Sequence, residues 1–208
     1  MHPAILTQKQ NELLPYLKAF KRKFYLVGGT AIALHLGHRR SIDFDLFCQT
    51  DINKKDIRKK LESFPFKIVK LSEDTDQIHF VINDVKITFF NYPYEIEHPL
   101  NIGQYLSFPS LLSLASMKAY ALGRRAKWKD YVDLFFILRD HHSVEEISRE
   151  AIKNFGQFYS EKLFREQLAF HKDINYSEPV EYLIDPPSEE EIRLFLIEKS
   201  VDFLASRT

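Results

Sequence analysis

The spacing of hydrophobic and polar residues divides the chain into a part with mixed periods and a part with helical periods alone. In the first part, apolar positions at helical spacing predict helices over residues 5–20 and 53–63. Short apolar runs predict strands over residues 24–27, 42–47, 66–70, 77–83 and 85–92. The last two strands are expected to form a hairpin, because Asn83 and Asp84 between them favour a tight turn.

The second part predicts helices over residues 109–123, 129–140, 144–155 and 160–171. A last helix opens at Ser188, with Glu191 placed for a capping box. The apolar residues expected to dock this helix on the others are Ile192, Phe195, Leu196 and Val201.

Residues 93–109, which hold three prolines, are the expected crossing between two lobes. The sequence therefore predicts an α/β (α+β) fold. Its first domain, residues 1–100, is a mixed sheet with flanking helices, and its second, residues 101–208, is a helical lobe that completes a cleft.

A short unit in the first part combines features of an anion site. The apolar strand 24–27 runs into Gly28 and Gly29, where backbone can approach a ligand with no Cβ atoms in the way. Thr30 is placed to cap a helix over residues 31–36, whose free amides favour an anion. Gly37 is a natural left-handed end for this helix. Phosphate is the anion that we expect there.

Two carboxylates stand one residue apart in the strand that follows. Alternation places Asp43 and Asp45 on one face and Ile42, Phe44 and Leu46 on the other. Adjacent carboxylates repel each other, whereas a hard divalent cation binds both as oxygen ligands. Mg²⁺, or Mn²⁺ in its place, bridged to a nucleoside triphosphate (NTP) is the occupant that these parts predict.

Each motif alone has a plainer interpretation. A glycine pair before a helix is common, and alternating Asp residues often mark only a solvated strand face. Their succession within one short unit favours the nucleotide site. A dinucleotide fingerprint fits poorly, because Gly28 and Gly29 lack the third glycine and the second strand follows too soon.

Two stretches of the chain resemble a known family. Residues 28–47 resemble the signature of the DNA polymerase β-like nucleotidyltransferase superfamily, and are similar to the AbiEii/AbiGii-type nucleotidyltransferase toxins of abortive-infection systems. Residues 117–122, Arg124 and residues 129–134 resemble that family's lysine helix and its Lys-Asp-x-x-Asp helix. The resemblance covers about residues 20 to 140.

The resemblance implies a role for each matching residue. It implies that Asp43 and Asp45 hold metal, that Lys118 contacts the triphosphate, and that Asp130 or Asp133 completes the site. The residues implied to bind the nucleotide are Gly28, Gly29, Thr30, Arg39, Ser41 and Lys118.

The chemistry of Lys118 agrees with this role, because a compact cation on an otherwise apolar helix can offset the charge of a leaving pyrophosphate. Its plainer interpretation is a lysine whose amine reaches solvent. Asp130 and Asp133 are neighbours on one helix face. In the alternative interpretation, one of the two acids has only a structural role: it caps the helix or pairs with Arg124, Arg125 or Lys127. Asp130 is favoured, although the sequence does not separate the two.

One position departs from the family pattern. Polymerase β-like enzymes carry a third carboxylate on a neighbouring strand, where it helps to deprotonate the acceptor, but the expected position near Thr88 has no acid. Asp84 is interpreted as a turn residue. Either Asp130 or Asp133 then acts as the base, or the chain binds nucleotide without transferring it.

Composition adds four constraints. With 208 residues, 45% hydrophobic and 28% charged, the chain is expected to be an ordinary globular protein. The single cysteine, Cys48, excludes an internal disulfide and fits a reducing cytosol. No apolar run is long enough for a bilayer and no signal-peptide pattern is seen, so we expect a cytoplasmic protein without a membrane partner. Basic and acidic residues balance at 29 each, so any polynucleotide must be recognised locally.

The sequence thus predicts a Mg²⁺-dependent nucleotidyltransferase that moves a nucleoside monophosphate from an NTP to an acceptor. The resemblance implies RNA, including tRNA, or a protein as acceptor, and a toxin countered by an antitoxin protein. The alternative is a degenerate nucleotidyltransferase fold that only binds a nucleotide or a partner, and the non-acidic Thr88 is its main support.

Overall fold

The computed structural model describes residues 1–122, 124 and 126–202, which form two compact units, Met1–Ser110 and a second unit that begins at Leu111. Gly123, the predicted end of one helix, and Arg125, a predicted partner of the acids, lie outside the described residues. Within the described ranges, no helix has both the length and the apolar character needed to cross a bilayer.

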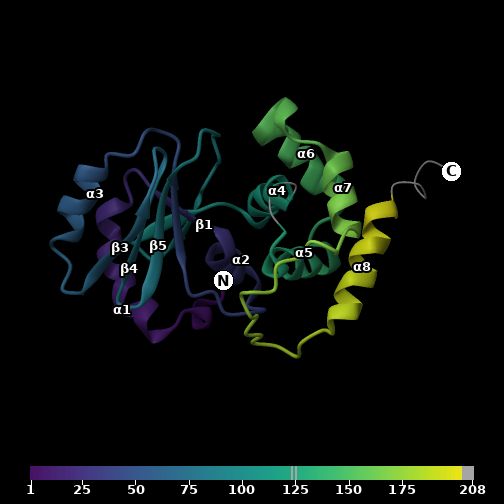
Figure 1. Cartoon of the computed structure of the whole chain (residues 1–208), viewed down its shortest axis with the longest axis horizontal. Coiled ribbons are helices and arrows are strands. Elements are labelled where there is room, and N and C mark those ends of the chain that lie inside the picture. Colours follow the sequence, from purple (N-terminus) through teal and green to yellow (C-terminus); the bar gives the residue numbers. More distant parts are fainter. Residues whose placement is uncertain (123, 125, 203–208) are drawn as a thin grey trace. The chain divides into compact units, whose positions relative to one another are not determined.

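The first unit is built on a five-stranded mixed sheet in the order β1-β2-β5-β4-β3 (Figure 1). The strands are β1 Tyr25–Val27, β2 Phe44–Cys48, β3 Ile68–Glu73, β4 Gln77–Ile82 and β5 Val85–Asn91. Strands β2 and β5 are parallel, and the other neighbours are antiparallel. This mixed sheet with helices confirms the predicted fold class.

Alternating burial explains why these segments form one sheet. In β2, Phe44, Leu46 and Cys48 are buried, whereas Asp45 and Phe47 between them are half-buried. The predicted hairpin of β4 and β5 is confirmed, and its turn residues Asn83 and Asp84 adopt left-handed φ values of 53° and 60°. The prediction that Ile42 shares the buried face of this strand with Phe44 and Leu46 is wrong, because Ile42 precedes β2 and is 54% exposed.

Three α-helices surround this sheet: α1 Gln8–Leu17, α2 Gly28–Leu36 and α3 Lys54–Leu61. In Figure 1, α3 and α2 lie on opposite sides of the sheet. The predicted helix over residues 5–20 is broken, because Thr7 caps α1 and short 3-10 turns, Pro3–Ile5 and Lys18–Phe20, flank it.

Residues 93–109 hold a small hairpin that the sequence analysis missed. Strands β6 Leu100–Ile102 and β7 Leu106–Phe108 pair antiparallel. Each has only three residues, and prolines flank the pair, so the pattern indicated a crossing. Phe108 is 1% exposed and packs its ring 5.3 Å from that of His35.

The second unit is helical (Figure 1). Its helices are α4 Leu111–Leu122, α5 Trp128–Asp140, α6 Val144–Phe155, α7 Glu161–Ala169 and α8 Glu189–Val201. Ser188 caps α8, since its hydroxyl accepts the amide hydrogen of Glu191; this is one half of the predicted capping box. Ile192 and Leu196 are buried and Phe195 contacts Phe135, but Val201 is 53% exposed, so its predicted docking is wrong.

Phe89, at the centre of β5, tests the packing of the sheet. Its ring is fully buried and lies 4.7 Å from the ring of Phe20 and 5.1 Å from that of Phe24. We expect Phe89→Ala to lower the free energy of unfolding by about 3–5 kcal/mol, because it opens a cavity under both rings. Phe158→Ala, at a side chain that is 61% exposed, is the control. Equal shifts of the two urea midpoints would contradict this packing.

Candidate functional site

Gly28 brings the backbone of the first unit against a carboxylate. It follows β1 directly and has a φ of +71°, which L side chains rarely adopt. A Cβ atom built on Gly28 would lie 2.3 Å from Oδ2 of Asp45. Glycine is therefore required here for two reasons, the backbone angle and the space occupied by Asp45.

Gly29 lies against a second polar pair. A Cβ atom there would lie 2.8 Å from Nη2 of Arg39 and 3.0 Å from Oγ of Ser41. The Arg39 side chain is 2% exposed, and its Nη1 donates to the carbonyl of Arg40 at 2.9 Å. A guanidinium, a hydroxyl and the N-terminus of the nine-residue helix α2 thus meet at one place, and each can bind an anion.

Thr30 has another structural role than the predicted helix cap. Helix α2 already begins at Gly28, with Val27 as N-cap and no side-chain cap, so Thr30 lies inside the helix. Its hydroxyl bonds to Oγ of Ser41 at 2.9 Å and to the backbone carbonyl of Asp43. Thr30 therefore ties α2 to the segment that leads into β2. The left-handed end at Gly37, with a φ of +69°, is confirmed.

The predicted metal ligands lie at the start of β2. Asp43 is one residue before the strand, and Asp45 pairs in register with Val27 of β1 and with Thr88 of β5. Both carboxylates are half-buried. Among the described residues, no group of three or more His, Cys, Asp or Glu could hold a metal ion. Two acids beside an anion site nevertheless fit Mg²⁺, which takes its remaining ligands from phosphate and water.

Thr88 occupies the position beside Asp45, and a histidine holds it. Nδ1 of His79 on β4 lies 3.1 Å from the Thr88 hydroxyl, and Nε2 lies 3.2 Å from Oε1 of Gln77. Burial, with a smaller contribution from Lys86, lowers the pKa of His79. His79 was not among the predicted site residues, although counting back from the 83–84 turn places residue 79 opposite residue 88.

Asp84 is a turn residue, as interpreted from the sequence. Its φ is 60°, its side chain is 77% exposed, and it pairs with Lys9. This contact lowers the pKa of Asp84.

Lys118 of the second unit is buried between the two predicted acids. Its Nζ contacts Asp130 and lies 3.0 Å from Oδ2 of Asp133. The three side chains are 7%, 3% and 0% exposed, so the interpretation of Lys118 as a solvent-reaching lysine is wrong. Both acids contact Lys118, and this contact does not choose between them.

Two cations considered as partners of these acids have other contacts. Lys127 pairs with Glu178 at 2.6 Å, and Arg124 lies 3.7 Å from the centre of the Tyr120 ring. Lys118 and the two carboxylates thus form ion pairs in a buried setting. Such a group is stable only while the ion pairs are complete.

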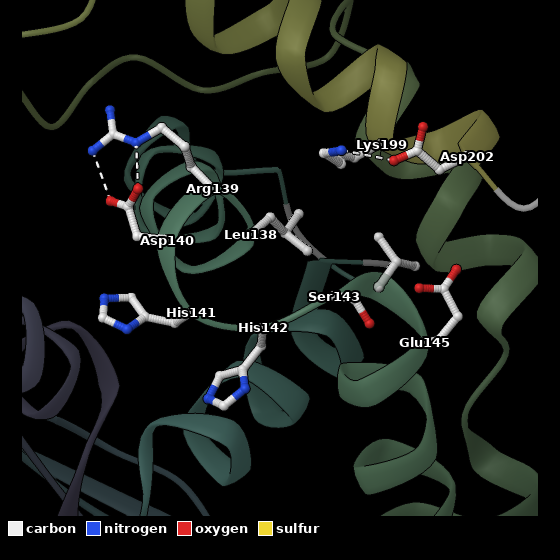
Figure 2. A pocket seen from close by; sticks show the side chains of 10 residues that line it. Leu138, Arg139, Asp140, His141, His142, Ser143, Glu145, Lys199 and Asp202 are labelled. Carbon is white, nitrogen blue, oxygen red and sulfur yellow. Dashed lines mark hydrogen bonds and ion pairs between the residues drawn. The ribbon is translucent and has the colours of Figure 1, made fainter.

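A surface pocket of about 320 Å³ in the second unit lies elsewhere (Figure 2). It is formed where α5 ends, α6 begins and α8 ends, and it contains none of the predicted site residues. Its charges are largely paired: Arg139 binds Asp140 through two hydrogen bonds, and Lys199 binds Asp202 (Figure 2). The Gly28 and Asp45 region is the better candidate for the chemistry, because groups that can bind an anion meet two carboxylates there.

The contact between Gly28 and Asp45 can be tested by a double-mutant cycle. We expect Gly28→Ala to destabilise the chain through the left-handed φ, by about 1–2 kcal/mol, and further through the clash with Asp45. When Asp45 is replaced by Ala, Gly28→Ala should lose only the stability that depends on the left-handed φ. The measurement is urea unfolding of the four proteins, and an equal loss in both backgrounds would argue against the contact.

The buried lysine gives a second stability test. Lys118→Met keeps the length of the side chain but leaves two carboxylates without their cation, so we expect a loss of about 3–5 kcal/mol. Lys162→Met is the matched control, because Lys162 is 85% exposed and lies 3.8 Å from Glu166. Thermal unfolding that shows no difference between the two variants would refute the buried cluster.

Comparisons with solved structures agree with this fold. MenT4, a nucleotidyltransferase toxin from Mycobacterium tuberculosis H37Rv, matches 92% of this chain and 80% of its own at a TM-score of 0.63 and 14% identity. A putative nucleotidyltransferase from Helicobacter pylori matches 96% of this chain and 93% of its own at a TM-score of 0.56 and 15% identity. At these identities the likeness shows the fold alone.

Sequence comparisons identify the family. An uncharacterized protein of Aquifex aeolicus (strain VF5) is 32% identical over 141 residues, which are 63% of this chain and 67% of the relative. The family described as "Nucleotidyl transferase AbiEii toxin, Type IV TA system" matches residues 16–202, which include both units and every predicted site residue. The chain therefore belongs to the AbiEii nucleotidyltransferase toxin family of type IV toxin-antitoxin systems.

Proposed function

We propose that this chain is a Mg²⁺-dependent nucleotidyltransferase that moves a nucleoside monophosphate from an NTP to RNA, with tRNA as a candidate acceptor, or to a protein. One observation carries the proposal: the backbone that can bind phosphate at Gly28 lies directly against the carboxylate of Asp45. Phosphate and metal ligands in contact are what a metal-bound triphosphate requires.

Each predicted site residue of the first unit is assigned a task in this reaction. The amides at Gly28 and Gly29, with Arg39 and Ser41, bind the triphosphate, and Thr30 holds the segment that carries Asp43 in place. Asp43 and Asp45 would hold Mg²⁺, or Mn²⁺, which when bound neutralises negative charge on the phosphates. The acceptor hydroxyl then attacks the α-phosphorus, and pyrophosphate leaves.

The task of the second unit rests on the family pattern of its helices. Lys118 is proposed to act on the triphosphate, and Asp130 or Asp133 to complete the site. Both acids contact Lys118, so they also fix the position of its amine. We propose that the enzyme acts in the cytoplasm as a toxin and that an antitoxin protein counters it, in line with the family description.

A specific observation favours a second candidate function. Thr88, in register with Asp45, is not an acid, so this strand position supplies no carboxylate to activate an acceptor. A chain of this kind could bind Mg²⁺ and an NTP without transferring the nucleotide. The two functions differ in turnover and agree in nucleotide binding.

Thermal unfolding with each of the four NTPs, with and without Mg²⁺, tests the proposed site. We expect a Mg²⁺-dependent stabilisation of about 2.7 kcal/mol at a hundred times the dissociation constant. Asp45→Asn should abolish it, because the neutral amide oxygen binds a divalent cation much more weakly than the charged carboxylate does. Asp84→Asn, which changes an exposed acid at the β4–β5 turn, should keep it.

Transfer is measured with α-labelled NTPs and bacterial tRNA. Label in the RNA that disappears in Asp45→Asn supports the nucleotidyltransferase. Stabilisation by Mg²⁺-NTP without label in RNA or protein supports the binding function instead. Absence of any stabilisation with all four NTPs would overturn the proposed site.

A further inference from the structure

Three polar side chains stand in a row across the sheet. Asp45 on β2 is in register with Thr88 on β5, and Thr88 is in register with His79 on β4. In-register residues of neighbouring strands point to the same face of a sheet. The row thus continues from the proposed metal ligand Asp45 across two further strands.

The hydrogen bonds of this row have a direction. Nε2 of His79 faces Oε1 of Gln77, which can only accept, so Nε2 carries the ring hydrogen. Burial lowers the pKa of His79 and so favours the neutral ring, in which Nδ1 accepts when Nε2 carries the hydrogen; the hydrogen bond at 3.1 Å is then donated by the Thr88 hydroxyl. Because its hydrogen points to His79, the Thr88 oxygen is left to accept a hydrogen bond from another group.

The strand order places Thr88 on the side of β2 that faces away from β1. Strand β2 lies between β1, which leads into Gly28 and α2, and β5, which carries Thr88. If the leaving phosphates lie at Gly28 and the N-terminus of α2, they are on the β1 side of Asp45. An in-line displacement brings the attacking oxygen from the opposite side, which is the side of β5.

We propose that the Thr88 oxygen accepts a hydrogen bond from the attacking acceptor hydroxyl and that His79 positions Thr88 for this contact; the inference rests on the proposed function. Thr88 only orients the hydroxyl, because its own hydrogen stays on its oxygen; as the bond to the α-phosphorus forms, the hydroxyl proton passes to water and pyrophosphate leaves. Thr88 is 8% exposed, so its surroundings leave a narrow approach. The structure assigns a neutral, hydrogen-bonded pair to the place beside Asp45.

Variants at both residues separate acceptor orientation from nucleotide binding. Thr88→Val keeps the shape and removes the hydroxyl, Thr88→Ser keeps the hydroxyl, and His79→Phe removes the ring nitrogens. We expect Thr88→Val and His79→Phe to lower kcat/KM for bacterial tRNA by roughly 10- to 100-fold, as for the loss of one to two hydrogen bonds. Thr88→Ser should remain close to the wild type. The stabilisation by Mg²⁺-NTP should be unchanged in all three.

The chain offers a matched control in another hydroxyl and histidine pair. Oγ of Ser107 on β7 lies 2.9 Å from Nδ1 of His98, and Ser107→Ala should change neither nucleotide binding nor transfer. Thermal unfolding without ligand shows whether each variant folds. If only one of Thr88→Val and His79→Phe folds, that variant is sufficient for the test.

Three outcomes would overturn the inference. Transfer at the wild-type rate by Thr88→Val excludes the contact with the acceptor. Loss of Mg²⁺-NTP stabilisation together with transfer places Thr88 in the nucleotide site instead. A wild-type protein that neither binds Mg²⁺-NTP nor transfers label overturns the proposed function, and the role of Thr88 falls with it.

Discussion

The contact between the backbone of Gly28 and the carboxylate of Asp45 is the constraint on which the candidate site depends. It follows from the antiparallel pairing of β1 with β2, which places Val27 opposite Asp45 and leaves the next residue, Gly28, beside the carboxylate. A side chain at Gly28 would push Asp45 away and force an unfavourable backbone angle. Gly28 is also the first residue of α2, so the N-terminal amides of this helix lie beside the carboxylate of Asp45.

The second unit is held by a different kind of interaction. Lys118, Asp130 and Asp133 are buried together. Burying charged groups raises the free energy of the folded state unless each charge is paired with an opposite one. An apolar group of the same volume could give equal or greater stability there. Stability of the fold therefore does not by itself account for a charged cluster in such a position.

The row from Asp45 to His79 has a hydroxyl where the sequence resemblance predicted a third carboxylate. A carboxylate beside Asp45 would add a third negative charge to a crowded site, whereas Thr88 is neutral and is held by His79. The hydroxyl has a defined direction because Gln77 fixes the hydrogen on the far ring nitrogen. The lack of an acid at position 88 is thus compatible with a group that orients the acceptor hydroxyl of the proposed reaction.

The sequence by itself determined those parts that local geometry controls. Alternation gave β2 its half-buried Asp45, the 83–84 turn set the hairpin of β4 and β5, and Gly37 ended α2, because each depends on neighbouring residues or on a short-range period. The site residues predicted within residues 28–45 also belong to one short unit. Only the tertiary structure decided that Thr30 joins α2 to Asp43, that Lys118 is buried between two acids, and that His79 holds Thr88. These contacts depend on which strands and helices pack together, and no local period carries that information.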